Sequence, residues 1–351
     1  MSARRILVTG GQGYLGTALT EELVNHGHQV VVVDNGLTSS VRLPLPGVRY
    51  LEGDVREPGT WASALAEVDA VVHLAAVVGD PACAVDPDLS WEVNYLGTAR
   101  VADACRAHRV RDLVLASTCS NYGVSAAAAA DVDSPVYPQS VYAESKVHAE
   151  HYLLAAAADG GLRPVILRFA TLFGLAPRMR FDLAVNVMTA RAVHEGVVPV
   201  HGGTQWRPFL HVRDAAAAVR LALSGPAAAS GGARIYNCGS GRLNHRIADL
   251  GRMIAEEVPG ATVSIGGGDG DSRDYQVSFD RIRAELGFEP RTSVPAGVRE
   301  IRDALLAGTP ADFTEEFHSD VRMVERAVRE RRPNARTRNG GAWPTLIFRA
   351  G

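Results

Sequence analysis

The sequence contains very little lysine. Of the 36 lysines and arginines in its 351 residues, Lys146 is the only lysine. Arginine is a rigid planar fork of donors, whereas lysine is a compact charge on a flexible stem. Because the chain uses arginine for every other permanent positive charge, we expect that a chemical role at position 146 requires lysine there.

Cysteine and long apolar runs are also scarce. The few cysteines are widely spaced, with no CxxC pair or Cys/His cluster: Cys83, Cys105, Cys119 and Cys238. This spacing argues against a disulfide framework and a structural zinc site, so we expect no metal. The apolar run near the N-terminus is too short for a signal peptide, and no other run could span a bilayer. With a net charge of -3, we expect a cytoplasmic protein with neither nucleic acid nor membrane as partner.

The first half of the chain alternates short apolar runs with helical patterns. Runs typical of buried parallel strands occupy 5–10, 29–34, 70–76, 112–118 and 164–170. Helix-like spacing of apolar residues occupies 16–26, 61–67, 93–108 and 142–158. This alternation predicts an α/β fold, a Rossmann-type doubly wound parallel sheet.

The regular alternation of apolar runs and helical patterns ends after about residue 172. This change predicts a second, smaller α/β domain. We assign 1–171 to the dinucleotide-binding domain, to which 208–237 return through a helix (214–223) and a strand (233–237). Residues 172–207 and 238–308 then form the C-terminal substrate-binding domain. The polar, arginine-rich stretch 309–351 is a C-terminal extension, with 330–341 as an extended tail. We expect loops at 125–135, near the site entrance, and at 266–272.

A glycine pattern follows the first predicted strand. "ILVTGGQGYLGTAL" places Gly10, Gly13 and Gly16 between a strand and an amphipathic helix. Glycines let the backbone approach a pyrophosphate, and the helix N-terminus offers free N–H donors. Asp34 ends the next strand, where a carboxylate can accept from the adenosine ribose hydroxyls and repel a 2′-phosphate. The pattern therefore predicts NAD rather than NADP.

Tyr142 and Lys146 lie four residues apart on a predicted helix, so they share one face. A tyrosine with a pKa of about 10 is a poor base at pH 7. A neighbouring ammonium and the positive nicotinamide stabilise the phenolate and lower that pKa. Lysine can do this while donating to the nicotinamide ribose, which an arginine fork would fit badly. This is the function we predict for the single lysine.

These motifs occur together. The TGGxGYLG opening, Asp34, "HLAA" (73–76), Asn94, "STCSNYG" (117–123) and YxxxK resemble the extended short-chain dehydrogenase/reductase family. More narrowly, they resemble its NAD-dependent nucleotide-sugar epimerase/dehydratase group, over roughly residues 4–305. The resemblance implies NAD as cofactor and a nucleotide-diphosphate sugar as substrate. It also implies a homodimer that pairs 93–108 and 142–158 in a four-helix bundle.

The resemblance also assigns roles to single residues. Tyr142 would remove a sugar hydroxyl proton, Lys146 would hold the ribose, and Thr118 would hydrogen-bond the same hydroxyl. Cofactor contacts would come from Gly10, Gly13, Tyr14, Leu15, Gly16, Asp34, Asn35, Asp54, Val55, Leu74, Ala75, Ala76, Asn94, Ser117, Tyr142 and Lys146. Substrate contacts would come from Thr118, Ser120, Thr171, Arg180, Asn186, Arg207 and Arg273, the last two as clamps on the diphosphate.

Three departures from the group's pattern bear on the reaction and on the substrate contacts. Cys119 and Ser120 stand where the 4,6-dehydratases of the group carry an Asp-Glu pair, so that dehydration lacks its acid and base. The 3,5-epimerases use a cysteine and a second lysine. Here the cysteine is offset by one position and no second lysine exists, which favours a packed thiol. Thr171 replaces an asparagine that usually contacts the diphosphate, so Arg178, Arg180 and Asn186 could take over part of that contact.

The resulting prediction is an NAD-dependent nucleotide-diphosphate-sugar epimerase that acts at C4 through a keto-sugar intermediate. The enzyme alternatives are a net NAD(H)-dependent nucleotide-sugar dehydrogenase or ketoreductase and, less favoured, a dehydratase. The non-enzyme alternative is a dinucleotide-sensing scaffold that has lost turnover. The sequence leaves open the nucleotide base, the sugar and the carbon that reacts.

Overall fold

A seven-stranded parallel sheet forms the centre of the molecule. The computed structural model describes residues 3–331, apart from 125–128, 159, 225–231 and 268–272. The strand order is β10-β6-β5-β4-β1-β2-β3. The strands are β1 (Arg5–Thr9), β2 (Gln29–Asp34), β3 (Val48–Glu52), β4 (Ala70–His73), β5 (Asp112–Thr118), β6 (Arg163–Phe169) and β10 (Arg234–Cys238). The predicted Rossmann-type sheet is confirmed.

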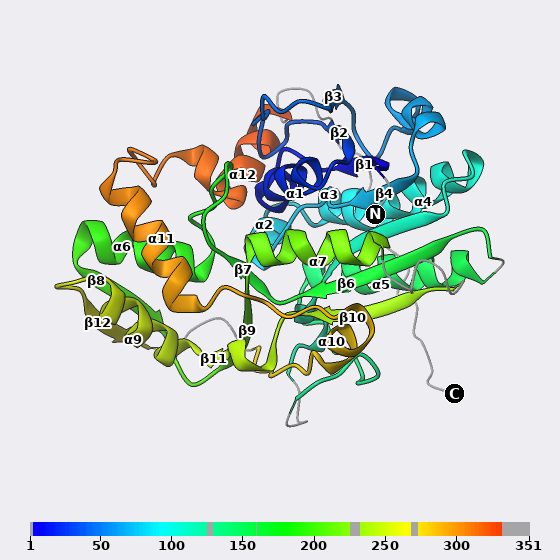
Figure 1. Cartoon of the computed structure of the whole chain (residues 1–351). Coiled ribbons are helices and arrows are strands. Elements are labelled where there is room, and N and C mark those ends of the chain that lie inside the picture. Colours follow the sequence, from blue (N-terminus) through cyan, green and yellow to red (C-terminus); the bar gives the residue numbers. More distant parts are fainter. Residues whose placement is uncertain (1–2, 125–128, 159, 225–231, 268–272, 332–351) are drawn as a thin grey trace.

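Helices cover both faces of this sheet (Figure 1). Along β1, Ile6 and Val8 pack into one core while Leu7 packs into the other, because successive side chains of a strand point to opposite faces. One core includes α1 (Tyr14–Asn25) and α7 (Val212–Ser224), and the other includes α4 (Gly97–Ala107) and α5 (Val141–Ala157). The sequence analysis did not predict β3. This edge strand is nowhere fully buried, and two of its five residues, Arg49 and Glu52, are charged, so it has no continuous apolar run.

Short elements connect the strands of this part. They are the 3-10 turns η1 (Pro58–Thr60), η2 (Ala62–Glu67) and η4 (Cys119–Tyr122), the helices α2 (Asp80–Val85) and α3 (Pro87–Trp91), and the π-helix η3 (Glu92–Leu96). The helix predicted at 61–67 is thus a 3-10 turn, and the one predicted at 93–108 is a π-turn followed by α4. Local apolar spacing does not distinguish these helix types.

A smaller α/β part lies beside the carboxyl ends of the strands. Its strands are β7 (Thr171–Phe173), β8 (Val197–His201), β9 (Trp206–His211), β11 (Asn244–Arg246) and β12 (Thr262–Gly266), paired in the orders β11-β9-β7 and β12-β8. Its helices are α6 (Ala184–Glu195), α9 (Ile247–Glu257) and α11 (Val294–Leu306), with η5 (Gly241–Leu243) beside β9. Two later elements return to the first part: α7 packs on α1, and β10 pairs with β6. Helix α10 (Asp280–Leu286) packs on β10.

The C-terminal segment folds back onto the first part. A 3-10 turn, η6 (Glu316–His318), leads into α12 (Asp320–Arg331), which packs against α2 with Val324 buried in the core. In Figure 1 the orange-red α12 lies against the N-terminal part, close to α2. The described part of 309–351 is therefore folded, and residues 330 and 331 end α12 instead of beginning a tail. The rest of the predicted tail, most of the loop at 266–272 and part of that at 125–135 lie outside the described residues.

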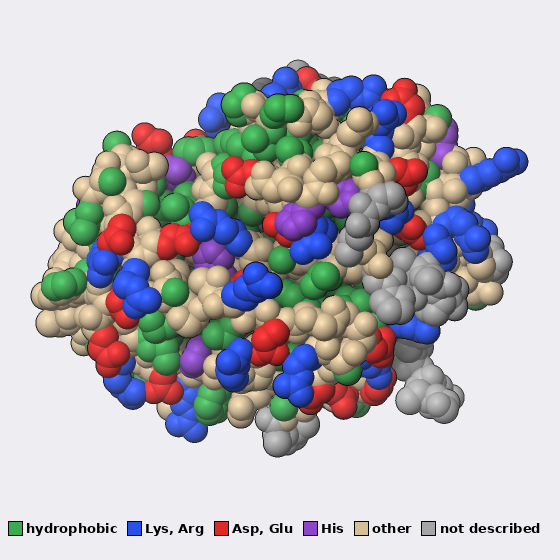
Figure 2. All heavy atoms as spheres, in the orientation of Figure 1, with side chains coloured by type: hydrophobic (Ala, Val, Ile, Leu, Met, Phe, Trp, Pro, Cys, Tyr) green, Lys and Arg blue, Asp and Glu red, His purple; other side chains and the backbone are tan. Residues whose placement is uncertain are grey.

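The surface shown in Figure 2 mixes both signs of charge. Basic and acidic side chains lie interspersed over this face, as the net charge of -3 leads one to expect. In the described ranges, no helix has the length and apolar character to cross a membrane.

Candidate active site

A cavity of about 430 Å³ opens at the carboxyl ends of the parallel strands, where open α/β sheets bind their ligands. Most of the predicted site residues line it, on β2, β5, α1 and α5, in the loops after β1, β3 and β4, and in the smaller part. They are Gly10, Gly13, Tyr14, Leu15, Gly16, Asp34, Asn35, Val55, Leu74, Ala75, Ala76, Ser117, Thr118, Ser120, Tyr142, Lys146, Thr171, Arg180, Arg207 and Arg273. Asp54, Asn94 and Asn186 are not part of this lining.

The glycine-rich turn after β1 leaves no room for side chains. Gly10 has φ +71°, and a Cβ there would lie 2.6 Å from the backbone nitrogen of Ala75. A Cβ on Gly16 would lie 2.3 Å from the carbonyl oxygen of Gly10 and 2.6 Å from the Cα of Gly11. The first turn of α1 is thus pressed against the loop, and its N-terminus opens into the cavity. This geometry fits a dinucleotide pyrophosphate, which needs close backbone approach and free N–H donors.

Asp34 is held at the end of β2 by backbone amides. Gln12 and Gly36 donate to its two carboxylate oxygens at 3.0 and 2.9 Å. Burial raises the pKa of Asp34, and these two amides oppose the rise. Asp34 lines the cavity, a position from which a carboxylate can accept from ribose hydroxyls.

Asp54 has a structural environment instead. Arg56 donates to it at 2.8 Å and Asn35 at 2.9 Å. Burial disfavours ionisation of Asp54, but the hydrogen bonds from Arg56 outweigh burial and lower its pKa to about 2. Its neighbours Gly53 and Val55 line the cavity, so Asp54 holds this wall in place.

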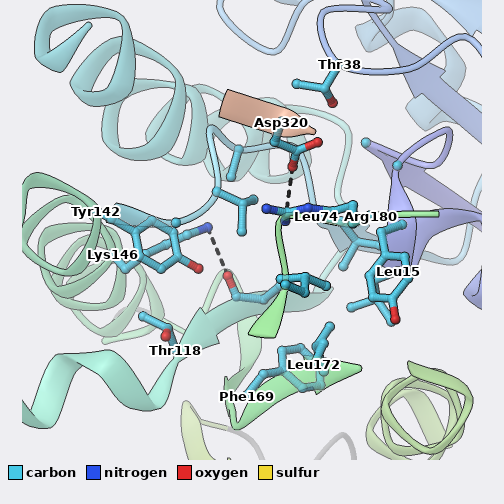
Figure 3. A pocket seen from close by; sticks show the side chains of 18 of the residues that line it. Leu15, Thr38, Leu74, Thr118, Tyr142, Lys146, Phe169, Leu172, Arg180 and Asp320 are labelled. Atoms are coloured by element: carbon cyan, nitrogen blue, oxygen red, sulfur yellow. Dashed lines mark hydrogen bonds and ion pairs between the residues drawn. The ribbon is translucent and has the colours of Figure 1, made fainter. Parts of the chain in front are cut away.

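Tyr142, Lys146 and Thr118 lie together on one side of the cavity (Figure 3). Ser140 caps α5 by accepting from the Ala143 amide at 3.2 Å, which begins the helix just before Tyr142. Tyr142 is hydrogen-bonded to Thr118, at the end of β5. The Lys146 Nζ donates to the carbonyl oxygen of Ala116 at 3.0 Å. The helix spacing and the strand end therefore bring the three predicted catalytic side chains to one place.

Burial dominates the protonation of this group. It raises the pKa of Tyr142, and Thr118 and Arg180 oppose the rise. Burial lowers the pKa of Lys146 to about 8, and the carboxylate of Glu150 opposes this effect. Lys146 is therefore mostly charged at pH 7. The positive charge of a nicotinamide ring would add to it in favouring the phenolate of Tyr142.

Asn94 connects two walls of the cavity from behind. It lies in the π-turn η3, accepts from the Val77 amide at 2.8 Å, and donates to the Val77 carbonyl at 3.0 Å and to the Ser145 Oγ at 3.1 Å. Ser145 in turn donates to the carbonyl of Tyr142 at 2.8 Å. Asn94 thus fixes the loop after β4 to the helix that carries the tyrosine.

Asn186 also acts behind the wall. Its side chain accepts from the Gly174 amide at 3.0 Å and donates to the Arg180 carbonyl at 2.9 Å. These bonds fold the 174–180 loop so that Arg180 faces the cavity. Arg178, which the sequence analysis also considered, is fully buried and does not line the cavity.

Arg207, Arg273 and Tyr275 also line the cavity. The Arg207 guanidinium lies 5.2 Å from the Tyr275 ring centroid, a cation–π contact. Arg273 pairs with Asp80 at 2.9 Å and donates to the Ser120 Oγ at 3.2 Å. Two guanidinium groups facing one cavity suit a diphosphate, as the sequence analysis expected.

Cys119 does not face the cavity. Its thiol donates to the Arg168 carbonyl at 3.1 Å, and burial raises its pKa. It is therefore a packed thiol in this structure. Across the described residues, no group of three His, Cys, Asp or Glu side chains could hold a metal ion.

The sequence analysis missed several lining residues, among them Asp80, Tyr275, Asp320 and Val321. Tyr275 lies two positions after Arg273, and that proximity was the available signal. Nothing local marks Asp320 and Val321. They reach the cavity only because α12 packs back onto the first part of the molecule.

Comparisons with known proteins give related sequences and structures. Residues 6–239 match the model of the NAD dependent epimerase/dehydratase family. The chain is 31% identical over 322 residues to UDP-glucose 4-epimerase of Azospirillum brasilense, covering 86% of this chain and 91% of that protein. It is 29% identical over 326 residues to dTDP-glucose 4,6-dehydratase of Streptomyces niveus, covering 84% and 91%. The solved UDP-glucose 4-epimerase of Thermus thermophilus in complex with NAD is similar at a TM-score of 0.75 and 30% identity, covering 87% of this chain and 99% of that one.

Proposed function

The chain belongs to the NAD-dependent epimerase/dehydratase family, with NAD as cofactor, and from that premise we propose that it is a nucleotide-diphosphate-sugar epimerase that acts at C4. The observation that carries the proposal is the cluster of Tyr142, Lys146 and Thr118 beside the glycine-rich turn in one cavity. With NAD bound, such a cluster would support oxidation of a sugar hydroxyl and reduction of the resulting ketone. Inversion at one carbon also requires that the keto sugar turn in the cavity, so that the hydride returns to its opposite face.

The residues divide this chemistry between them. NAD, when bound, supplies the acceptor and donor of the hydride. Tyr142 takes the proton of the sugar hydroxyl as base and returns it as acid. Thr118 donates to the same oxygen, which carries negative charge as the ketone forms. Lys146 favours the phenolate of Tyr142, and Arg207 and Arg273 hold the substrate diphosphate.

The side chains next to Thr118 favour an epimerase over a dehydratase. Dehydration needs an acid for the leaving hydroxyl and a base for a carbon-bound proton. Cys119 is turned away from the cavity and Ser120 is not an acid. The carboxylates that line the cavity within the described residues already have partners: Asp34 has backbone amides, Asp80 has Arg273 and Ser140, and Asp182 and Asp320 have Arg180.

The test is proton NMR of the purified protein with a panel of nucleotide sugars, UDP-glucose included, in deuterated water without added cofactor. An epimerase yields a new C4 epimer without deuterium in its ring, because the hydride leaves and returns directly. Deuterium at C3, C5 or C6 would instead indicate enolisation and contradict the proposal in favour of a dehydratase. Turnover only with added NAD or NADH would indicate a net dehydrogenase or ketoreductase.

Replacing Tyr142 with phenylalanine tests the catalytic assignment. Tyr142→Phe removes the hydroxyl that moves the proton and keeps the ring, so we expect kcat to fall at least ~100-fold. KM should change little, because the phenyl ring still fills the same wall. Unchanged turnover in the same NMR assay would overturn the assignment of Tyr142 as the base. The dinucleotide-sensing scaffold would be favoured only if the wild type itself converted no nucleotide sugar.

A homodimer is the expected assembly, with η3, α4 and α5 at its interface. Half-buried aromatic rings gather on this side of the molecule: Trp91 and His148 lie 5.1 Å apart, Tyr95 and His148 5.7 Å, and Tyr95 and Tyr152 6.5 Å. Aromatic side chains are enriched in interfaces. Light scattering of the purified protein would decide, and a monomer at micromolar concentration would contradict this expectation.

A cytoplasmic location is also part of the proposal. The four cysteines are all free and buried, as in proteins of reducing compartments.

A further inference from the structure

The first turn of α12 forms part of the cavity wall. Asp320 and Val321 line the cavity, and Asp320 is 6% exposed. We propose that Asp320 is a positioning residue that fixes Arg180 in the active site, so that the C-terminal segment 309–331 is a functional part of that site. This inference rests on the proposed function, because it concerns how the same cavity binds its nucleotide sugar.

Two carboxylates hold the guanidinium of Arg180. Its Nε and one terminal nitrogen donate to the two oxygens of Asp182 at 2.9 and 3.0 Å. The other terminal nitrogen lies 3.0 Å from an Asp320 oxygen. Contacts at all three nitrogens prevent the planar group from turning. Each contact occupies at most one of the five N–H groups of a guanidinium, which leaves two donors for a ligand.

Arg180 faces the place where cofactor and sugar meet. Figure 3 shows it between Tyr142 and Lys146 on one side and Leu15, in the first turn of α1, on the other. Burial raises the pKa of both Tyr142 and Tyr14, and the charge of Arg180 opposes the rise in each. A shift of this guanidinium would therefore change the contacts of a ligand that reaches from the glycine-rich turn to the catalytic tyrosine.

The carboxylate of Asp320 also pairs with a second arginine, which has a structural role. Asp320 pairs with the fully buried Arg178 at 2.6 Å. Arg178 donates to the carbonyl oxygens of Thr38 at 2.9 Å and Phe317 at 3.2 Å. The backbone N–H of Asp320 also donates to Asp182 at 2.9 Å. Arg178 thus anchors the C-terminal segment to the loop after β2. Arg180, in contrast, lines the cavity, so Asp320 can affect ligand binding through Arg180.

A double-mutant cycle in the full-length protein tests the inference. Asp320→Asn keeps the shape of the side chain and removes its charge, so we expect the KM for UDP-glucose to rise about tenfold, with a smaller change in kcat. Arg180→Gln should have an effect at least as large. In the Arg180→Gln background, Asp320→Asn should change KM by no more than about twofold, because Asp320 acts through Arg180. Fully additive effects, or an unchanged KM in Asp320→Asn alone, would overturn the inference.

Val324→Ala is the matched control for loss of packing. Val324 is 1% exposed and anchors α12 in the core, but it does not line the cavity. We expect this variant to lower the melting temperature by about 2–8 °C and to keep KM within about twofold of the wild type. A rise in KM as large as that of Asp320→Asn would assign the effect to the anchoring of α12 and contradict the role of Asp320.

Calorimetric binding of UDP-glucose to the NAD-saturated variants separates this inference from the proposed function. A wild type that binds UDP-glucose without converting any nucleotide sugar would contradict the epimerase assignment. The dissociation constants of the wild type and the variants would then replace KM in the double-mutant cycle, so the role of Asp320 could still be tested. A wild type that does not bind UDP-glucose would contradict this inference directly.

Discussion

Replacing Lys146 with methionine should remove activity and, at neutral pH, should not destabilise the fold. The Lys146 side chain is 2% exposed, and burial lowers its pKa from 10.5 to about 8. The folded state is therefore a poorer environment for this charge than the unfolded chain is. Chemistry at the site explains why the chain tolerates such a residue there.

The magnitude follows from that pKa. A drop from 10.5 to about 8 corresponds to roughly 3 kcal/mol of lost stability at pH 7, at about 1.4 kcal/mol for each pH unit. Methionine is unbranched and of similar length, so it fills the same space. It leaves the Ala116 carbonyl without its 3.0 Å partner, which costs about 1–3 kcal/mol. We expect Lys146→Met to be about as stable as the wild type or up to about 2 kcal/mol more stable at pH 7.

The pH dependence is the sharper measurement. Below about pH 8, lysine is protonated in both states and the full destabilisation is present. Between about 8 and 10.5 only the unfolded chain holds the proton, so wild-type stability gains with rising pH relative to the variant. Urea unfolding of both proteins at pH 7, 8.5 and 9.5, after removal of NAD, should show that the free energy of unfolding of the wild type rises by about 2 kcal/mol relative to that of Lys146→Met. The buried cysteines and tyrosines are common to both proteins and cancel.

If the difference in the free energy of unfolding between the two proteins stays constant from pH 7 to 9.5, that result would refute the claim that burial lowers the pKa of Lys146. Turnover should fall at least ~100-fold in Lys146→Met. Lys146→Arg is the matched control for charge. It keeps the positive charge at every pH, but its fork does not fit the site of a lysine that donates to a single carbonyl, so we expect it to be inactive as well.

Two further variants test the cofactor turn and the buried support of the site. Gly16→Ala should lower bound NAD at least about tenfold, measured as NAD released on denaturation, because the new Cβ would meet the Gly10 backbone at 2.3 Å. Gly59→Ala, which meets nothing within 4 Å, is its control, and equal NAD contents would contradict the assignment of the turn. Glu150→Gln should lower the free energy of unfolding by about 3–5 kcal/mol, because Arg168, paired with Glu150 at 2.7 Å, would keep a buried charge without its counter-ion. Adding Arg168→Met should restore part of that stability in urea unfolding, and a double variant as unstable as the sum of both single variants would count against a coupled pair.

The sequence by itself determined the buried strands of the sheet and the catalytic face, but not the partly exposed edge strand β3. Buried parallel strands require continuous apolar runs such as 29–34. The glycines after β1 are required because the first turn of α1 packs directly against the loop that precedes it in the sequence. Tyr142 and Lys146 share one face because a helix repeats every 3.6 residues. These features depend on local geometry, so the chain displays them directly.

Only the tertiary structure decided which of the polar residues face the cavity. Asn94 and Asn186 fit the predicted pattern, yet both turn away from the cavity and brace its walls through bonds to Val77 and Gly174. Asp320 carries no local signal, and it reaches Arg180 because Val324 buries α12 against the core. Contacts between segments so far apart depend on how packed elements meet, which no local periodicity in the sequence encodes.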